Sequence, residues 1–236
     1  MGLFSSFFHR ENVKQEDTDE ASGHLRDLPT SSSPVGGVSE PRSTLTPFTT
    51  FFGQAAPNQE FDGTVANFID QLGGRSFGDG LIRSFNWEEK MKWEQIVREC
   101  IPTDNCDYEL FSFAWDGACF GVEAAGEKST ILLFDIGDLK CKPVPMTLTD
   151  FLNVEIPGDC DGYLAANSYQ KWLKTHPAPK RSECVGHKIP LFLGGRDDFD
   201  NMEIIDMQVQ WEMTAQIWQA VRDLPPGTPI GSIRFE

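Results

Sequence analysis

The chain has 236 residues, of which 36 are Asp or Glu and 20 are Lys or Arg, so its formal net charge is −16 at pH 7. This length fits one large domain or two small ones that share an interface, and so acidic a surface repels phosphates, which argues against direct nucleic-acid binding. No apolar run approaches the roughly 18 residues that span a bilayer, so we expect no membrane span and a cytoplasmic protein.

The Cys and His residues give no sign of a metal site or of a secreted disulfide framework. The six Cys are scattered without a C-x-x-C pair, and the four His form no paired ligand spacing with them. We therefore expect free thiols in a reducing compartment, no zinc and no cofactor.

Residues 1–47 are expected to form a disordered tail. They hold an acidic run at 16–20 and a segment rich in Ser and Gly at 30–37, with few large apolar residues after Phe8. Ordering such a stretch has little to offset its entropy cost. The first six residues also match the loose N-myristoylation pattern. Limited proteolysis is expected to trim this tail and to leave a core from about residue 50.

The second region, residues 48–157, is expected to contain helices followed by an antiparallel meander. Apolar residues at helical spacing predict a helix over 64–72. Asn86 and Glu89 predict a capping box at the start of a helix over 87–100. Strand-like segments joined by turn residues follow at 108–115, 118–123, 130–136 and 140–144. This pattern predicts an α+β fold, a twisted antiparallel sheet with helices packed on it.

The third region, residues 158–236, is expected to pack with the second as one unit. A helix is predicted from Tyr163 to Leu173, and a strand over Ile189–Leu193 with the side chains of Leu191 and Leu193 on one face. If Leu193 were fully buried there, Leu193→Ala would cost about 2–5 kcal/mol. The longest predicted helix runs from about 206 to 223 and ends before two prolines.

No motif for catalysis occurs in the sequence: a nucleophile elbow, H-E-x-x-H, a Walker loop and a kinase signature are all missing. His187 lies in an apolar context, but a lone His is more often structural than catalytic. The run of Asp197, Asp198 and Asp200 lacks the ligand register of an EF-hand calcium loop. Three interpretations of these acids stay open: a solvated turn, a cap for the next helix, or a contact for a basic partner.

The segment from Cys184 to Gly195 resembles the C-terminal domain of the Tdi-type immunity proteins of type VI secretion systems. In that family a G-x-x-x-P-x-x-L-G-G strand precedes an N-x-x-x-x-D entry to a long helix, matched here by Gly186–Gly195 and by Asn201 with Asp206. The middle of the chain resembles GAD-like and SUKH-like domains of bacterial immunity proteins. The elements that carry this second likeness are Ser76–Leu81, Phe111–Trp115 and Cys119–Gly121.

Together these resemblances cover roughly residues 60–230 and leave out the tail. They imply an α+β fold with one twisted sheet, and a protein that binds and blocks a toxin without catalysis. We therefore expect a non-enzymatic immunity protein whose partner is a cognate basic toxin, a nuclease being one candidate. Negative charge would speed its encounter with such a partner, and Asp197, Asp198 and Asp200 are the candidate contacts.

Two other functions remain open at this point. One is a non-catalytic intracellular regulatory or scaffold module of the same superfamily. The other, weaker alternative is a hydrolase that uses His187 with an acidic residue.

Overall fold

The computed structural model describes residues 43–103, 106–124 and 130–225, together with positions 228 and 230. Most of the expected tail, residues 1–42, lies outside the described residues. Within the last five positions of that expected tail, Leu45 is fully buried and helix α1 (Thr46–Phe51) begins. The packed part of the chain therefore includes the end of the 1–47 range.

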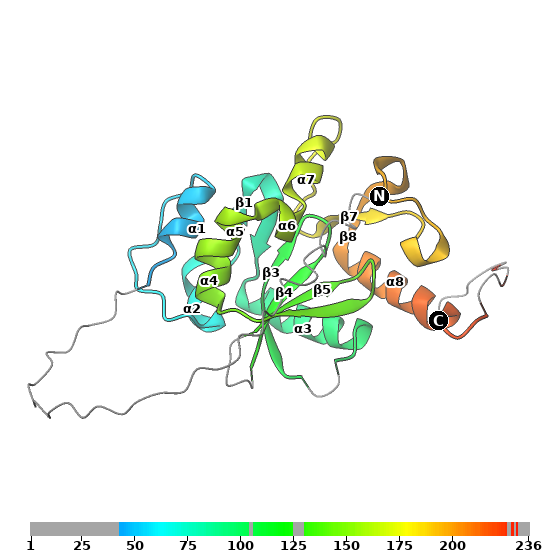
Figure 1. Cartoon of the computed structure of the whole chain (residues 1–236), viewed down its shortest axis with the longest axis horizontal. Helices are drawn as coiled ribbons and strands as arrows, with labels where there is room; N and C mark the ends of the chain where they lie inside the picture. Colours follow the sequence, from blue (N-terminus) through cyan, green and yellow to red (C-terminus); the bar gives the residue numbers. More distant parts are fainter. Residues whose placement is uncertain (1–42, 104–105, 125–129, 226–227, 229, 231–236) are drawn as a thin grey trace, which may run out of the picture.

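A six-stranded antiparallel sheet forms the centre of the fold, and each strand pairs with the next one along the chain (Figure 1). The expected α+β class and the expected meander are confirmed. Two short strands, which the sequence did not predict, precede the four that it did. The strands are β1 (Ser76–Phe77), β2 (Ile82–Ser84), β3 (Tyr108–Ala114), β4 (Cys119–Glu123), β5 (Ile131–Asp135) and β6 (Lys140–Val144).

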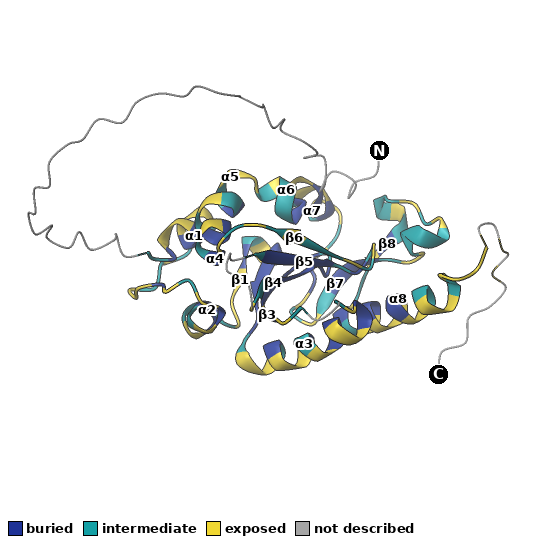
Figure 2. Ribbon diagram, turned by 60° about the horizontal axis from the view of Figure 1, so that its bottom comes forward, coloured by how far each residue is buried: buried dark blue, intermediate teal, exposed yellow. Residues whose placement is uncertain are grey.

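The central strands are buried on both faces, because helices cover the sheet on both sides (Figure 2). In β5, Ile131 and Leu133 belong to one hydrophobic cluster, whereas Leu132 and Phe134 belong to the other. Side chains that alternate along a strand produce this division. The uninterrupted apolar sequence of β5 is therefore that of a strand buried on both sides.

The helices form two outer layers. Helices α3 (Trp87–Cys100) and α8 (Met207–Val221) lie side by side on one face (Figure 2). The helical segments whose apolar residues join the other cluster are α1, α2 (Val65–Leu72), α4 (Leu148–Asp150), the π turn η3 (Phe151–Glu155), α5 (Ile156–Gly158), α6 (Cys160–Leu164) and α7 (Ala166–Trp172). Among the described residues, no helix is long and apolar enough to cross a membrane.

Side-chain caps fix the starts of the three longest helices. Thr64 caps α2 by accepting a hydrogen bond from the Asn67 amide. At α3 the predicted capping box of Asn86 and Glu89 is confirmed in both directions. The Asp206 carboxylate accepts the first free amides of α8, as a negative group at a helix N-terminus should.

The predicted strand over Ile189–Leu193 is wrong. Strand β7 lies earlier, at Glu183–His187, and pairs antiparallel with β8 (Met202–Asp206). Leu191–Leu193 forms a 3₁₀ turn in which no residue is buried. Pro190 precedes this turn, and its missing amide cannot join a ladder. Leu193 is therefore not fully buried, and Leu193→Ala is not expected to lower the free energy of unfolding by about 2–5 kcal/mol.

The predicted helix over 163–173 is interrupted. Ala165 adopts a left-handed conformation with φ of 47°, and it separates α6 from α7. The Asp161 carboxylate accepts a hydrogen bond from the Asn167 amide, at 2.7 Å, across the break. Hydrogen bonds between Asp side chains and nearby backbone amides compete with the backbone bonds of a continuous helix, and this bond favours the break.

The regions 48–157 and 158–236 contribute to the same two hydrophobic clusters. The Val185 amide donates a hydrogen bond of 2.8 Å to the Trp115 carbonyl, which joins β7 to the end of β3. The Trp115 indole Nε1 donates to the Leu164 carbonyl at 2.9 Å. The first bond holds the β7–β8 pair against the end of the main sheet, and the second holds α6 there.

Candidate functional site

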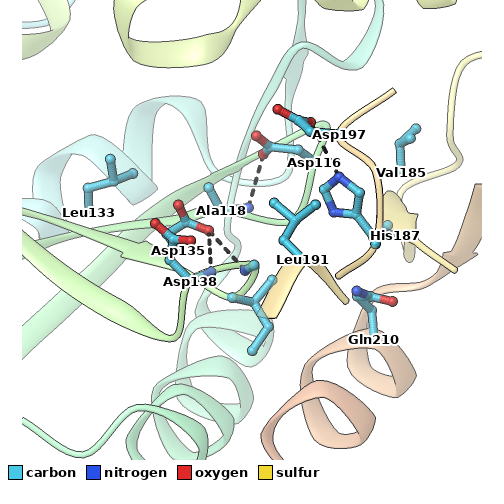
Figure 3. Close-up of a pocket in the computed structure, with 14 residues that line it drawn as sticks. Asp116, Ala118, Leu133, Asp135, Asp138, Val185, His187, Leu191, Asp197 and Gln210 are labelled. Carbon is cyan, nitrogen blue, oxygen red and sulfur yellow. Dashed lines mark hydrogen bonds and ion pairs between the residues drawn. The ribbon is translucent and has the colours of Figure 1, made fainter. Parts of the chain in front are cut away.

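A pocket of about 380 Å³ opens where the main sheet meets the β7–β8 pair (Figure 3). Its walls come from the β3–β4 turn, the end of β5 with the following turn, β7 with its following loop, and α8. Its ionisable lining residues are Asp116, Asp135, Asp138, His187 and Asp197, and its larger apolar lining residues are Leu133, Ile136, Val185 and Leu191. Four aspartates and no Lys or Arg face this space among the described residues.

Asp116 is held in the wall by the β3–β4 turn, which the sequence correctly predicted as a hairpin turn. Its carboxylate Oδ1 accepts a hydrogen bond of 3.1 Å from the Ala118 amide. Gly117 has φ of +89°, a conformation that favours glycine, and a Cβ there would lie 3.2 Å from the Cys184 sulfur. The Trp211 indole donates a hydrogen bond to the Gly117 carbonyl at 2.9 Å, so α8 helps to hold this turn in place.

Asp135 ends β5 and organises the β5–β6 turn. Its Oδ1 accepts a hydrogen bond of 2.9 Å from the Gly137 amide, and its Oδ2 lies 3.8 Å from the Lys142 ammonium. Burial raises the pKa of the Asp135 carboxyl, and the nearby Asp138 adds to that rise. These two carboxyl groups form the second acidic wall of the pocket.

Asp116 has the most perturbed carboxyl group of the pocket. Burial raises its pKa to about 7, the Ala118 hydrogen bond opposes the rise, and the charge of Asp135 adds to it. A carboxyl group in such surroundings lacks sufficient compensating positive charge. The Asp116 carboxyl group is therefore partly protonated near neutral pH, and a bound cation beside it would favour its ionised form.

His187 and Asp197 face each other across the pocket wall, with Nε2 3.5 Å from Oδ1 (Figure 3). Both side chains are only 13% exposed. Burial lowers the pKa of His187, an effect that Asp197 opposes. His187 is therefore neutral at pH 7, and Asp197 is an acceptor within the site instead of the freely exposed charge that the sequence suggested.

The other two candidate acids lie outside the pocket lining. Asp198 caps the short turn η5 (Phe199–Asn201) through the Asn201 amide, and it forms an ion pair with Arg196. Asp200 is exposed, and its backbone carbonyl accepts a hydrogen bond from the Lys188 ammonium at 3.0 Å. The three acids that the sequence grouped together therefore have three different environments.

Gln210 closes the pocket from α8. Its side chain is 8% exposed, and its Nε2 donates to the Thr214 hydroxyl at 3.3 Å. A Cβ at Gly186 would lie 2.6 Å from the Gln210 amide carbon, so glycine in β7 is what lets this amide approach the pocket. Gln210 therefore contributes a nearly buried polar amide to this wall.

The chemical groups of the described lining are carboxyl groups, one imidazole, one side-chain amide and apolar side chains. His187 with Asp197 could act as a general base. The lining, as far as the structure describes it, holds no hydroxyl, thiol or amine nucleophile to be activated. The described residues also contain no group of three or more His, Cys, Asp or Glu side chains that could hold a metal ion. A half-apolar pocket with carboxyl groups in its walls is suited to a cation that carries an apolar stem.

Asp116→Asn should raise the free energy of unfolding at pH 8 by about 2–4 kcal/mol. In the folded protein the pKa of Asp116 lies above its unfolded value. The stability gained from protonation is therefore present below the unfolded pKa and lost as pH rises through about 7. Asparagine imitates the protonated acid and still accepts the Ala118 hydrogen bond. Urea titrations between pH 5 and pH 8 should show a gain that shrinks as pH falls.

The matched control for this change is Asp223→Asn, because the Asp223 side chain is 88% exposed. It removes the same charge and should shift stability little at any pH. A parent protein as stable as the Asp116→Asn variant at pH 8 would contradict the buried, uncompensated state of Asp116.

No family model matches this chain, and no curated protein matches it. Among solved structures, the crystal structure of Atu4351 from Agrobacterium tumefaciens is similar, with a TM-score of 0.46 and 16% sequence identity. The similarity covers 60% of this chain and 69% of that chain. It is a distant likeness.

Proposed function

We propose that this protein is an immunity protein, which binds a partner protein toxin with a basic surface and neutralises it without catalysis. The observation that carries the proposal is the acidic pocket, with four aspartates and no cation in its described lining, in a chain of net charge −16. The motif resemblance at Gly186–Asn201 supports it independently, because this segment comprises the end of β7 and the loop on one side of the pocket.

The negative charge extends beyond the pocket. Asp198 and Asp200 lie on the loop that also carries Asp197, so we propose that all three contribute to the contact surface. A toxin that cuts nucleic acid must present a basic cleft to phosphate. An acidic surface can occupy such a cleft and block it, and its field raises the association rate by about 10–10³-fold at low salt.

The experiment starts from the full-length protein, tagged and immobilised, and a lysate of the organism that encodes it. A basic protein should be retained at about 50 mM NaCl and released by about 500 mM, because the attraction is screened by salt. Expressed alone, that protein should arrest growth of a test strain, and co-expression of the present chain should restore growth.

Two results would count against the proposal. The first is a captured partner that is harmless when expressed alone, which would favour the regulatory or scaffold function. The second is restored growth that requires His187 as an acid or base: His187→Gln would then abolish protection while capture stays intact, which would favour an enzyme that destroys the toxin or its product.

A further inference from the structure

We propose that the acidic pocket receives an arginine side chain of the partner, with the guanidinium at the carboxyl groups of Asp116 and Asp135 and the aliphatic stem against Leu133 and Leu191. This inference rests on the proposed function, because the partner supplies the arginine. It adds the chemical identity of the anchor and the residues that select it.

The size and the lining of the pocket fit one long side chain. Its volume of about 380 Å³ lies at the small end of the range of roughly 300–1,000 Å³ seen for specific ligand pockets. Leu133 and Leu191 provide apolar contact for methylene groups, as snorkelling cations require. The carboxyl groups of Asp116 and Asp135 project into the same space from two adjacent turns (Figure 3).

The available acceptors match a guanidinium better than an ammonium. The Asp116 carboxylate accepts hydrogen bonds from backbone amides, that of Ala118 at 3.1 Å and its own, and so keeps acceptor capacity. The carboxyl group of Asp135 is a second acceptor on a different wall, and Gln210, which is 8% exposed, adds a polar side-chain amide to the lining. A guanidinium spreads its donors around a plane and can satisfy separated acceptors, whereas an ammonium is a compact point charge.

Ionisation of Asp116 should control the binding. The guanidinium pairs with the carboxylate form of Asp116, and in the unliganded protein the pKa of this carboxyl group is about 7. Affinity for the cation should therefore increase about tenfold between pH 6 and pH 8. Binding of the cation should release a proton from the Asp116 carboxyl group. The charged and titratable groups around Asp116 are Asp135, Asp138 and Lys142 of the β5–β6 hairpin, Arg83 of β2, Cys119 of β4, Cys184 and His187 of β7, and Asp197 of the following loop.

His187 also has a shifted pKa, because burial disfavours its charged form. Its lowered pKa keeps it neutral above pH 6.5, and its protonation at lower pH would add a positive charge to the pocket. Both titrations therefore act in the same direction, and each disfavours a bound cation as pH falls.

The test uses a blocked tripeptide, acetyl-Gly-Arg-Gly-amide, titrated into the isotopically labelled full-length protein and followed by NMR at the Gln210 side-chain amide and the His187 ring. Saturable shifts at both positions are expected. The matched probe replaces arginine with citrulline, which keeps the shape and removes the charge, and it should not bind. A lysine peptide should bind more weakly, and free L-arginine more weakly still, because its own carboxylate is repelled.

Asp116→Asn should lower the affinity for the arginine peptide at least about tenfold at pH 8. It should also remove the pH dependence of that affinity. Asp223→Asn, which removes an equally charged but exposed side chain, should leave both unchanged. Equal binding of the citrulline peptide, tighter binding of lysine or of free arginine, or full affinity in Asp116→Asn would each overturn the inference.

The outcomes separate this inference from the proposed function. A protein that captures its toxin but ignores the arginine peptide would overturn the inference and leave the function standing. A protein that binds the peptide with the expected dependence on Asp116, but retains no toxin from the lysate, would support the pocket and contradict the immunity function.

Discussion

Arg83→Met should lower the free energy of unfolding by about 3–5 kcal/mol. Arg83 is 1% exposed in β2, and its Nη1 donates hydrogen bonds to the carbonyls of Lys180 at 2.6 Å and Glu183 at 2.9 Å. Its Nη2 lies 3.4 Å from the Ala114 carbonyl, and its guanidinium stacks 4.6 Å above the Phe113 ring centroid. Methionine fills the same volume but leaves these buried carbonyls without a donor, which is the costly part of the change.

Burial lowers the pKa of Arg83 to about 10, so the side chain remains charged at pH 7. Its bonds reach from the main sheet to the segment that leads into β7, so it joins the regions on either side of residue 157. The parent should therefore unfold in a single urea transition. The control is Arg75→Met, which removes an exposed guanidinium nearby and should change stability by less than about 0.5 kcal/mol. Equal stability of the two variants would contradict the structural role of Arg83.

Trp211→Ala should cost about 3–5 kcal/mol, the range for a large buried aromatic side chain. Trp211 is fully buried, packs edge-on against Trp93 at a centroid distance of 6.1 Å, and donates its indole hydrogen to the Gly117 carbonyl. Its loss removes packing between α3 and α8 and also frees the turn that positions Asp116. We therefore expect weaker binding of a basic partner even under conditions in which the variant stays folded.

The control for this change is Trp87→Ala. Trp87 is 45% exposed and donates to Asp70 at the surface, so its removal should cost much less. Thermal unfolding of both variants provides the comparison. A Trp211→Ala protein that melts within about 2 °C of the parent would show that α8 is not an essential support of the pocket.

Elements with local signals could be predicted from the sequence. The capping box of Asn86 and Glu89 and the Asp116–Gly117 turn are each encoded within a few residues, and both are present. The strand over Ile189–Leu193 was predicted wrongly because its apolar run is locally strand-like. In the fold, the Asn201 side chain accepts from the Ile189 amide and donates to its carbonyl, which fixes a loop there. That contact spans twelve positions, and no local pattern reveals it.

The candidate site was accessible to sequence reasoning only in part. His187 and the acids from Asp197 onward were recognised as chemically interesting, but the partnership of His187 with Asp197 was not. Asp116 and Asp135 belong to turns whose sequence signals describe backbone shape and say nothing about burial. Their raised pKa values come from burial in the folded chain, which is a property of the tertiary structure alone.

The central claim is that this acidic face captures a basic toxin, and the association rate constant of the captured toxin measures it most directly. The comparison uses the parent, the Asp197→Asn plus Asp198→Asn variant, and Asp223→Asn at about 50 and about 500 mM NaCl. We predict a rate that falls steeply with salt for the parent and for Asp223→Asn. The double variant should show a slower, flatter rate. Because Asp198 caps a turn, the free energy of unfolding of the double variant is measured in parallel. A loss of more than about 1 kcal/mol with an unchanged association rate would assign these acids to folding alone and contradict the claim.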